Sequence, residues 1–173
     1  MKACAQGSRK AQFEVYKRYY KAMYNTAFRM LGNSMEAEDV MQESFLKAFQ
    51  KIETYKGEVS FGSWLKKIVV NRSLDILKTK KALLSIDSVQ EMSDEGSEEV
   101  TLRRDDLSPE LVKNVIQELP EGYRVVLSLY LIEGYDHEEI SSILNITEST
   151  SRTQYHRAKK KLATALESLK AVS

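Results

Sequence analysis

Glycine and proline, the two residues that most often interrupt helices, are scarce in this chain. Its 173 residues include 7 glycines and 2 prolines, so long segments contain no residue that would break a helix. Leucine, lysine, glutamate and alanine, which favour helices, are abundant, and 42% of the residues are hydrophobic. That hydrophobic content is too high for a wholly disordered chain. The composition therefore predicts an all-α protein.

Apolar residues recur at spacings of three and four in three segments of the first half, which is typical of amphipathic helices. The predicted helices run over residues 12–31, 35–54 and 61–81, and residues 32–34 supply a C-cap followed by an N-cap. We expect the first helix to bury Phe13, Tyr16, Tyr20, Tyr24, Ala27 and Leu31. The second should bury Val40, Met41, Ser44, Phe45, Ala48, Phe49 and Ile52, and the third Phe61, Leu65, Ile68, Val69 and Ile76.

The second half begins after a segment of different composition. Residues 82–107 have few large apolar side chains and many Ser, Asp and Glu, which predicts a flexible acidic linker. Ser108-Pro109-Glu110 then combines an N-cap, a first-turn proline and an acidic first turn. Four further helices are predicted over residues 109–119, 121–133, 137–144 and 148–169. The chain thus divides into two small helical domains, residues 1–81 and 108–173, each with a modest core.

Charge is sorted along the chain, although the net charge is only +1. Residues 1–81 contain 16 Lys and Arg against 8 Asp and Glu, whereas residues 82–110 contain 2 against 9. Residues 149–161 contain five basic residues and no acidic one. Two basic regions separated by an acidic segment favour two contacts with a polyanion, although ordinary solvated helix faces would give the same counts.

Residues 136–147 form the sharpest local pattern of the chain. Asp136 and Glu139 have the spacing of a capping box, Asn145 tolerates a left-handed backbone, and Thr147 can cap the next helix. A short helix, a tight turn and a second helix with basic residues predict a helix-turn-helix. The second helix carries side chains that can contact base edges and phosphates, namely Thr150, Arg152, Thr153, Gln154, His156 and Arg157. A plain helical hairpin with a basic end is the alternative.

Aromatic and basic residues meet at the start of the third predicted helix. Tyr55, Phe61 and Trp64 lie close in sequence to Lys56, Lys66 and Lys67. Such a mixture suits single-stranded DNA, since bases stack on rings and cations follow the backbone. We expect Phe61 to belong to the core and Tyr55 to present an exposed ring. Further along, Lys67, Asn71, Lys78 and Lys81 are predicted to face outward, with Trp64 at the border of this strip.

Other charged residues of the first half allow two interpretations. Arg72 and Asp75 are three residues apart near the predicted buried face, and we expect a structural ion pair between them. The acidic cluster from Glu36 to Glu43 is either a solvated face or a docking surface for a basic or mixed partner helix.

Features of enzymes, metal sites and membrane spans are missing from the sequence. His137 and His156 have no ligand-like neighbours at metal spacing, and we expect His137 to be a surface residue. The single cysteine, Cys4, excludes a disulfide framework, and no P-loop, dinucleotide turn or nucleophile elbow occurs. The longest largely apolar run, residues 125–132, is much shorter than the roughly 20 residues of a membrane-spanning helix. We therefore expect a cytoplasmic protein without enzymatic activity, cofactor, metal or membrane insertion.

Two sets of motifs resemble a known family. The first set comprises Glu38-Asp39, Gln42-Glu43, Phe45, Tyr55, Gly57, Phe61, Trp64-Leu65, Ile68, Asn71 and Asp75. The second set comprises Leu119-Pro120-Glu121, Arg124-Val125, Glu133-Gly134, Glu138-Glu139-Ile140, Ile146, Thr150, His156 to Lys159 and Leu162. In this order and spacing, the two sets resemble domains two and four of the extracytoplasmic-function (ECF) sigma factors of bacterial RNA polymerase.

The resemblance implies a function and assigns roles to residues. Core RNA polymerase would be bound through Glu38, Asp39, Gln42, Glu43 and Phe45. The minus-ten promoter element would be opened, and a flipped base held, by Tyr55, Trp64, Lys67, Asn71 and Lys78. The minus-thirty-five element would be read in the major groove by Thr150, Arg152, Thr153, Gln154, His156 and Arg157. The linker would pass through the polymerase, and an anti-sigma factor would mask both domains.

The chain also departs from the family pattern. Lys78 and Lys81 stand where arginine is common, Ser151 replaces a usual valine, and Gln154 replaces a usual basic residue. The first predicted helix starts several residues later than in the family, as a trimmed N-terminus would produce.

Two other functions compete with the sigma-factor hypothesis. A helix-turn-helix regulator that is not a polymerase subunit would explain the second half but would leave residues 55–81 and the acidic helix unused. An adaptor or anti-sigma mimic would make no DNA contact, and the basic cluster from Arg152 to Lys161 argues against it.

Overall fold

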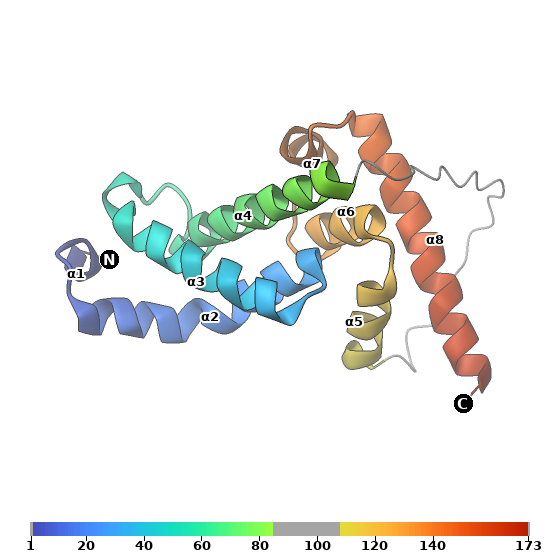
Figure 1. Cartoon of the computed structure of the whole chain (residues 1–173), viewed down its shortest axis with the longest axis horizontal. Helices are drawn as coiled ribbons and strands as arrows, with labels where there is room; N and C mark the ends of the chain where they lie inside the picture. The colour runs from blue at the N-terminus through green and yellow to red at the C-terminus, as the bar shows by residue number, and fades with distance from the viewer. Residues whose placement is uncertain (1, 85–107, 173) are drawn as a thin grey trace. The chain divides into compact units, whose positions relative to one another are not determined.

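Every regular element in the described part of the chain is a helix. The computed structural model describes residues 2–84 and 108–172, and the chain divides into two compact units, residues 1–83 and 84–173. Figure 1 shows α1 (Lys2–Ala5), α2 (Arg9–Leu31), α3 (Ser34–Gln50) and α4 (Phe61–Leu84) of the first unit. The 3-10 helix η1 (Ile52–Thr54) lies between α3 and α4 in the chain. The second unit contains α5 (Pro109–Glu118), α6 (Glu121–Leu131), α7 (His137–Leu144) and α8 (Glu148–Val172). The predicted all-α class is confirmed.

The junction between α2 and α3 follows the local sequence. Gly32 adopts a left-handed backbone, with φ of 71°, and its N–H donates to the carbonyl of Phe28. Asn33 then caps α3, because its side-chain oxygen accepts from the N–H of Glu36 at 3.1 Å. Glycine is the residue that adopts this conformation at least cost, so the predicted C-cap and N-cap are both confirmed.

The aromatic stripe predicted for the first helix is largely wrong. Phe13 is 58% exposed, and Tyr16, Tyr20 and Tyr24 are only half-buried. The buried face of α2 is instead made by Met23, Thr26, Ala27, Met30 and Leu31. A tyrosine hydroxyl needs water or a partner, so these rings lie at the flanks of the buried face; Tyr16, for example, packs against Phe45 of α3 with the ring centroids 4.9 Å apart.

The buried face of α3 agrees with the prediction, and that of α4 agrees in part. Val40, Met41, Ser44, Phe45 and Ala48 are buried, Ile52 of η1 is buried, and Phe49 is half-buried. In α4, Phe61, Leu65 and Val69 are buried as expected, but Ile68 and Ile76 are half-exposed. The buried face of α4 also includes Val70, Ser73, Leu74 and Leu77. The buried face of α4 is therefore wider than a single stripe, and the burial of the residues at its edge was predicted wrongly.

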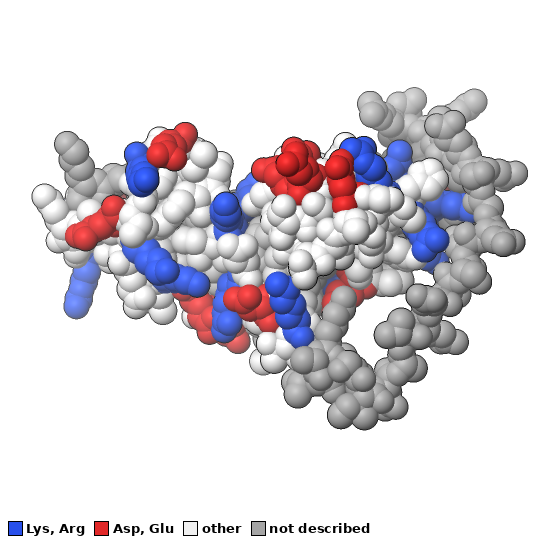
Figure 2. Space-filling model, turned by 90° about the horizontal axis from the view of Figure 1, so that it is seen from above, with Lys and Arg blue, Asp and Glu red and all other residues white. Residues whose placement is uncertain are grey.

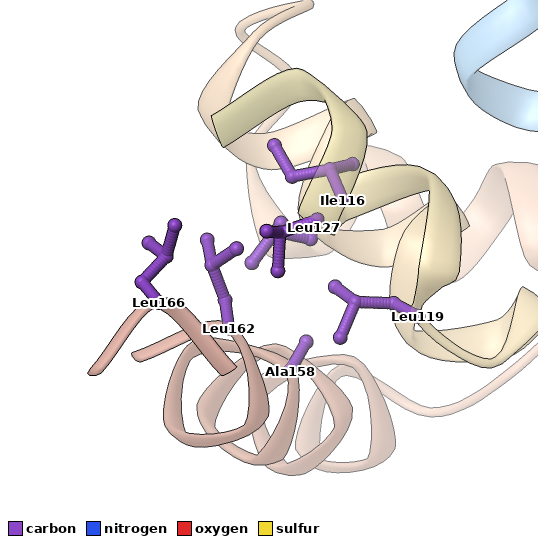
Figure 3. Close-up of a cluster of buried hydrophobic side chains, with 7 residues drawn as sticks. Ile116, Leu119, Leu127, Ala158, Leu162 and Leu166 are labelled. Carbon is purple, nitrogen blue, oxygen red and sulfur yellow. The ribbon is translucent and has the colours of Figure 1, made fainter. Parts of the chain in front are cut away.

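The helix α8 carries the core of the second unit. Figure 3 shows Ala158, Leu162 and Leu166 of α8 facing Ile116 of α5, Leu119 directly after α5, and Leu127 of α6. These side chains are all buried, and Val115 completes the cluster. The spacing of four between Ala158, Leu162 and Leu166 places them on one face of the helix. Hence one face of α8 packs in the core, and the opposite face lies outside this cluster.

A buried arginine closes the end of α5. The Arg124 guanidinium donates through Nη1 to the carbonyls of Gln117 and Leu119, both at 3.2 Å. These carbonyls lie at the helix C-terminus, where no later N–H within the helix can reach them. Burial lowers the pKa of Arg124 from its ordinary value, and the nearby Glu121 opposes that shift. Arg124 is therefore a structural residue that joins α6 to α5.

Part of the predicted linker lies in α4. The helix continues to Leu84, three residues beyond its predicted end, and the remainder of the segment predicted as a flexible linker, residues 85–107, lies outside the described residues. Among the described helices, none is long and apolar enough to cross a membrane.

Candidate nucleic-acid interfaces and docking surface

The turn between α7 and α8 is built as predicted. Asp136 Oδ1 accepts from the Glu139 N–H at 2.8 Å, and Glu139 Oε2 accepts from the Asp136 N–H at 2.9 Å, which completes a capping box. Asn145 ends α7 in the left-handed region, with φ of 55° and ψ of 49°. Thr147 Oγ1 then accepts from the Thr150 N–H at 3.0 Å, where α8 begins. These local bonds define a helix-turn-helix with α8 as its second helix.

The first three turns of α8 present polar and basic side chains to solvent. Thr150, Arg152, Thr153, His156 and Arg157 are exposed, whereas Gln154 is half-buried, with its amide oxygen near Gly122 of α6. Thr153, His156, Arg157 and Lys160 follow one another at spacings of three, one and three, so they lie on one face. That face is opposite the one buried against α5 and α6. Together with Thr150 and Arg152 at its borders, this face offers donors and acceptors that can contact base edges and phosphates in a major groove.

Several of these side chains already have partners. Arg152 Nη2 pairs with Glu148 Oε1 one turn earlier, and the Thr150 hydroxyl bonds to the Thr147 hydroxyl at 2.7 Å. The ammonium groups of Lys159 and Lys161 lie 5.9 Å and 6.0 Å from the ring centroids of Tyr155 and Tyr123. To contact a base, Arg152 must therefore leave Glu148, which is a cheap step because both side chains are exposed.

His137 is the main residue that sequence reasoning misplaced in the second unit. We expected it on the surface, but it is 8% exposed. Its Nδ1 lies 2.9 Å from the Oγ of Ser151, and its ring stacks on Tyr130 with a centroid distance of 4.4 Å. The partners come from α6 and α8, and no local pattern around position 137 indicates them.

An aromatic cluster forms between η1 and the start of α4. The Tyr55 ring contacts Phe61 and Trp64, with centroid distances of 5.6 Å and 5.4 Å, and Phe61 lies 5.6 Å from Trp64. The Tyr55 hydroxyl donates to the carbonyl of Val59 at 2.6 Å, which closes the loop that contains Gly57. Phe61 is buried, as predicted, but Tyr55 is half-buried rather than fully exposed, because its ring packs on the other two. Trp64 is half-buried too, so both residues remain partly accessible.

The basic strip beyond this cluster also lies on the surface. Lys67, Asn71 and Lys78 of α4 are all exposed, at spacings of four and seven that keep them on one side of the helix. The predicted fourth member of the strip, Lys81, lies where the structure describes no side chain.

Ion pairs join α3 to α4. Arg72 Nε donates to Glu43 Oε2 at 2.6 Å, and Lys80 Nζ to Glu36 Oε2 at 2.6 Å. The hydrogen bond to Glu43 raises the pKa of Arg72, an effect that burial opposes and the charge of Asp75 assists. The predicted pairing of Arg72 with Asp75 is wrong, because the guanidinium bonds to Glu43 of the neighbouring helix and Asp75 contributes only its charge. In Figure 2, acidic and basic side chains lie next to each other in several places.

Most of the residues predicted to dock on a partner lie on the outward face of α3, but Phe45 does not. Glu38, Asp39 and Gln42 are exposed, and Gln42 Nε2 donates to Glu38 Oε1 at 3.2 Å. Phe45 is 3% exposed and packs among Tyr16 and Phe49, so its side chain cannot contact a partner in this structure. Leu46 is 64% exposed instead. Beside it opens a pocket of about 390 Å³, lined by residues that include Lys47, Gln50 and Arg72.

Known proteins resemble this chain over almost its whole length. Two family models match the chain, "Sigma-70 region 2" over residues 15–82 and "Sigma-70, region 4" over residues 110–162. The ECF RNA polymerase sigma factor SigW of Bacillus subtilis is 32% identical, over 98% of this chain and 96% of its own length. The chain belongs to the ECF RNA polymerase sigma factors. The RNA polymerase sigma-H factor of Pseudomonas aeruginosa is 27% identical, over 94% of this sigma factor and 90% of the relative.

Solved structures share the fold of this sigma factor. The sigma factor RpoE of Bartonella quintana, solved with the anti-sigma factor NepR, gives a TM-score of 0.59 at 17% identity, covering 91% of this chain and 98% of RpoE. CnrH, solved with the cytosolic domain of CnrY, gives a TM-score of 0.54 at 21% identity, covering 96% and 94%.

Family membership decides between the alternatives left open by the sequence. The region 2 match includes the aromatic cluster, the basic strip of α4 and the acidic face of α3. These are the features that a helix-turn-helix regulator outside the polymerase would leave without a role. The protein is therefore a sigma factor, which directs core RNA polymerase to promoters in transcription initiation.

Proposed function

We propose that the two units of this sigma factor divide promoter recognition and polymerase docking between them. Residues 1–81 dock on core polymerase and open the minus-ten element, residues 108–173 read the minus-thirty-five element, and residues 82–107 connect them. The observation that carries this proposal is that Thr153, His156 and Arg157 are exposed on the outer face of α8, directly after the turn of the helix-turn-helix. The sigma factor supplies binding and strand separation and no catalysis, and it acts in the cytoplasm.

The docking surface is the outward face of α3. Glu38, Asp39 and Gln42 offer acceptors and a negative charge, and Leu46 adds an exposed apolar contact one turn further on. An apolar contact bordered by charged groups is the common anatomy of a protein interface. In this proposal Glu43 contributes mainly through its bridge to Arg72, and Phe45 supports α3 from the core.

The surface for the melted strand runs from the aromatic cluster along α4. Trp64 and Tyr55 provide partly exposed rings on which an unpaired base can stack. Lys67 and Lys78 can follow the phosphates, and Asn71 can bond to a base edge. Stacking on a protein ring offsets part of the cost of removing a base from the duplex.

Substitutions at Tyr55 test this surface. Tyr55→Ala should reduce open-complex formation by about 1–3 kcal/mol, because a stacking ring is lost, while closed-complex binding changes little. Tyr55→Phe is the matched control, since it keeps the ring and removes only the bond to the Val59 carbonyl. Permanganate reactivity of the melted region measures the effect, and Asn71→Ala should reduce it too. Wild-type reactivity in Tyr55→Ala would show that this loop does not hold the melted strand.

The surface for the minus-thirty-five element is the N-terminal half of α8. Recognition helices usually enter the major groove with their first turns, where Thr150, Arg152 and Thr153 lie. His156 and Arg157 follow one turn later, and Gln154 can reach the groove only from the edge beside α6.

Base reading and phosphate binding are expected to separate along α8. Arg152→Ala should lower promoter binding by roughly 1–3 kcal/mol and flatten the preference at one or two positions. Lys160→Ala should weaken all promoters alike and reduce the magnitude of the salt slope by about one. Glu148→Gln is a useful third variant, because it releases Arg152 from its ion pair. A promoter library transcribed with each variant measures both quantities; an unchanged preference in Arg152→Ala would make Arg152 a phosphate contact.

We also infer that an anti-sigma factor regulates this protein. The related RpoE of Bartonella quintana was solved with such a factor. Here the exposed side chains of Met35 and Leu46 on α3 give a partner an apolar contact next to the docking residues. Occupation of that face would compete directly with core polymerase.

Abortive-transcript synthesis tests the proposed function as a whole. Purified sigma factor, core polymerase and candidate promoters should yield short transcripts, and neither core alone nor the sigma factor alone should do so. Binding to duplex DNA without any core-dependent transcript, on promoters that a related ECF factor uses with the same core, would contradict the proposal.

A further inference from the structure

A buried polar pair ties the two helices of the helix-turn-helix together. His137 is the first residue of α7, and its Nδ1 lies 2.9 Å from the Oγ of Ser151 in the first turn of α8. His137 is 8% exposed and Ser151 is fully buried. The bond therefore joins the start of one helix to the start of the next across 14 residues of sequence, independently of the turn at Asn145.

The imidazole is held from two further sides. It stacks on Tyr130 of α6, with the centroids 4.4 Å apart and the planes inclined by 19°. Tyr155 of α8 meets the edge of the same imidazole at 5.6 Å and packs on Tyr130 at 4.5 Å. The rings of Tyr130 and Tyr155, from two other helices, thus fix the direction in which Nδ1 points.

Such a hydrogen-bonded pair fixes the orientation of α8 more than it stabilises the fold. Apolar contacts such as those of Ala158 tolerate small rotations of a helix, whereas a hydrogen bond requires a defined distance and angle. If α8 turned about its axis, the hydrogen bond between the Ser151 hydroxyl and His137 Nδ1 would break. Both groups are buried, and a buried polar group without a hydrogen bond destabilises the protein. The pair therefore selects one rotational setting of α8.

The rotational setting matters because Ser151 lies between two residues of the reading surface. Thr150 and Arg152 are its exposed neighbours. A rotation of about 10° moves an atom roughly 6 Å from the helix axis by about 1 Å, which is enough to break a hydrogen bond to a base edge. We propose that His137 and Ser151 form a positioning pair that determines which base positions α8 reads. This inference rests on the proposed reading of the minus-thirty-five element by α8.

The pair can be broken from either end with small changes. Ser151→Ala removes the hydroxyl, and His137→Phe removes the nitrogen but keeps a ring for Tyr130 and Tyr155. Each variant should reduce discrimination between the preferred base and its competitors, at the positions that α8 contacts, by about threefold to tenfold. The double variant should lose no more than either single one, since both remove the same bond. His137→Asn, which keeps a polar atom near the place of Nδ1, should recover part of the discrimination.

The measurement is a promoter-library selection with the full chain and core polymerase, and amide hydrogen exchange verifies that α8 remains folded. Uniform weakening of all promoters with an unchanged ranking would overturn the positioning role and leave a structural one. Additive losses in the double variant would also overturn it. Arg152→Ala, measured in parallel, separates promoter reading by α8 from the positioning role of the pair. If Arg152→Ala alters the promoter ranking and the His137 and Ser151 variants do not, only the positioning role is refuted. Unaltered rankings in all variants refute reading by α8, and the pair's role with it.

Discussion

Replacing Asp39 by lysine together with Leu46 by aspartate should lower the affinity of this sigma factor for core polymerase by about 30-fold or more, which is about 2 kcal/mol. Both side chains are exposed on α3, so the substitutions should cost the fold little. The loss should arise because an apolar contact is replaced by a charge and an acidic group by a basic one. Competition for labelled core polymerase measures the change.

Two further variants sharpen this experiment. Glu14→Lys makes the same change of charge on the exposed side of α2 and should leave core affinity unaltered. Leu46→Ala separates loss of the apolar contact from the introduced charge. Asp39 is preferred to Glu43, because reversing Glu43 would also break its ion pair with Arg72 and disturb the contact between α3 and α4. Wild-type core affinity in the Asp39/Leu46 double variant would exclude this face of α3 as the docking surface.

Leu127→Ala should destabilise the second unit by about 2–5 kcal/mol, the usual result of a cavity in a packed core. Leu127 of α6 is fully buried among Ile116, Leu119 and Leu162 (Figure 3). Small units have little stability in reserve, so a large share of α8 should exchange its amide hydrogens rapidly and lose promoter binding. Amide hydrogen exchange of α8 is the direct measurement.

The first unit provides an internal reference for the Leu127 experiment. The single tryptophan of the chain, Trp64, lies in α4, so the unfolding transition followed by its fluorescence should not move. Leu131→Ala is the matched control, because it makes the same substitution on the same helix at a residue that is 52% exposed. Equal effects of the two substitutions on the stability of the second unit would mean that α6 is not packed as described. A loss of stability below about 1 kcal/mol in Leu127→Ala would mean the same.

The helix-turn-helix shows how much local sequence can specify. Asp136, Glu139, Asn145 and Thr147 each make bonds with residues no more than four positions away. Capping boxes, left-handed turns and threonine caps depend on the chemistry of those few residues and need no distant partner. For that reason the boundaries of α7 and the start of α8 could be predicted without a structure.

The candidate site was predictable to a smaller degree. The exposed donors of α8 and the strip of Lys67, Asn71 and Lys78 follow from helical spacing once the buried face is known. Spacing cannot show whether a ring such as Tyr55 packs on its neighbours, nor that Leu46 remains uncovered while Phe45 is buried. Those outcomes depend on the elements that come to lie beside each residue.

By itself, the sequence determined the helices α2 to α8 apart from some of their ends, the turn before α8 and the family to which the chain belongs, because these depend on residue types at short and regular spacings. The short helix α1 and the break between α3 and η1 were not predicted. Only the tertiary structure decided that Arg72 pairs with Glu43 rather than with Asp75, and that Phe13 faces solvent. It also decided that His137 is buried against Ser151. The two pairings join residues from different helices, and the exposure of Phe13 depends on which face of its helix is covered. Burial is set by the packing of whole elements rather than by a residue's neighbours in sequence.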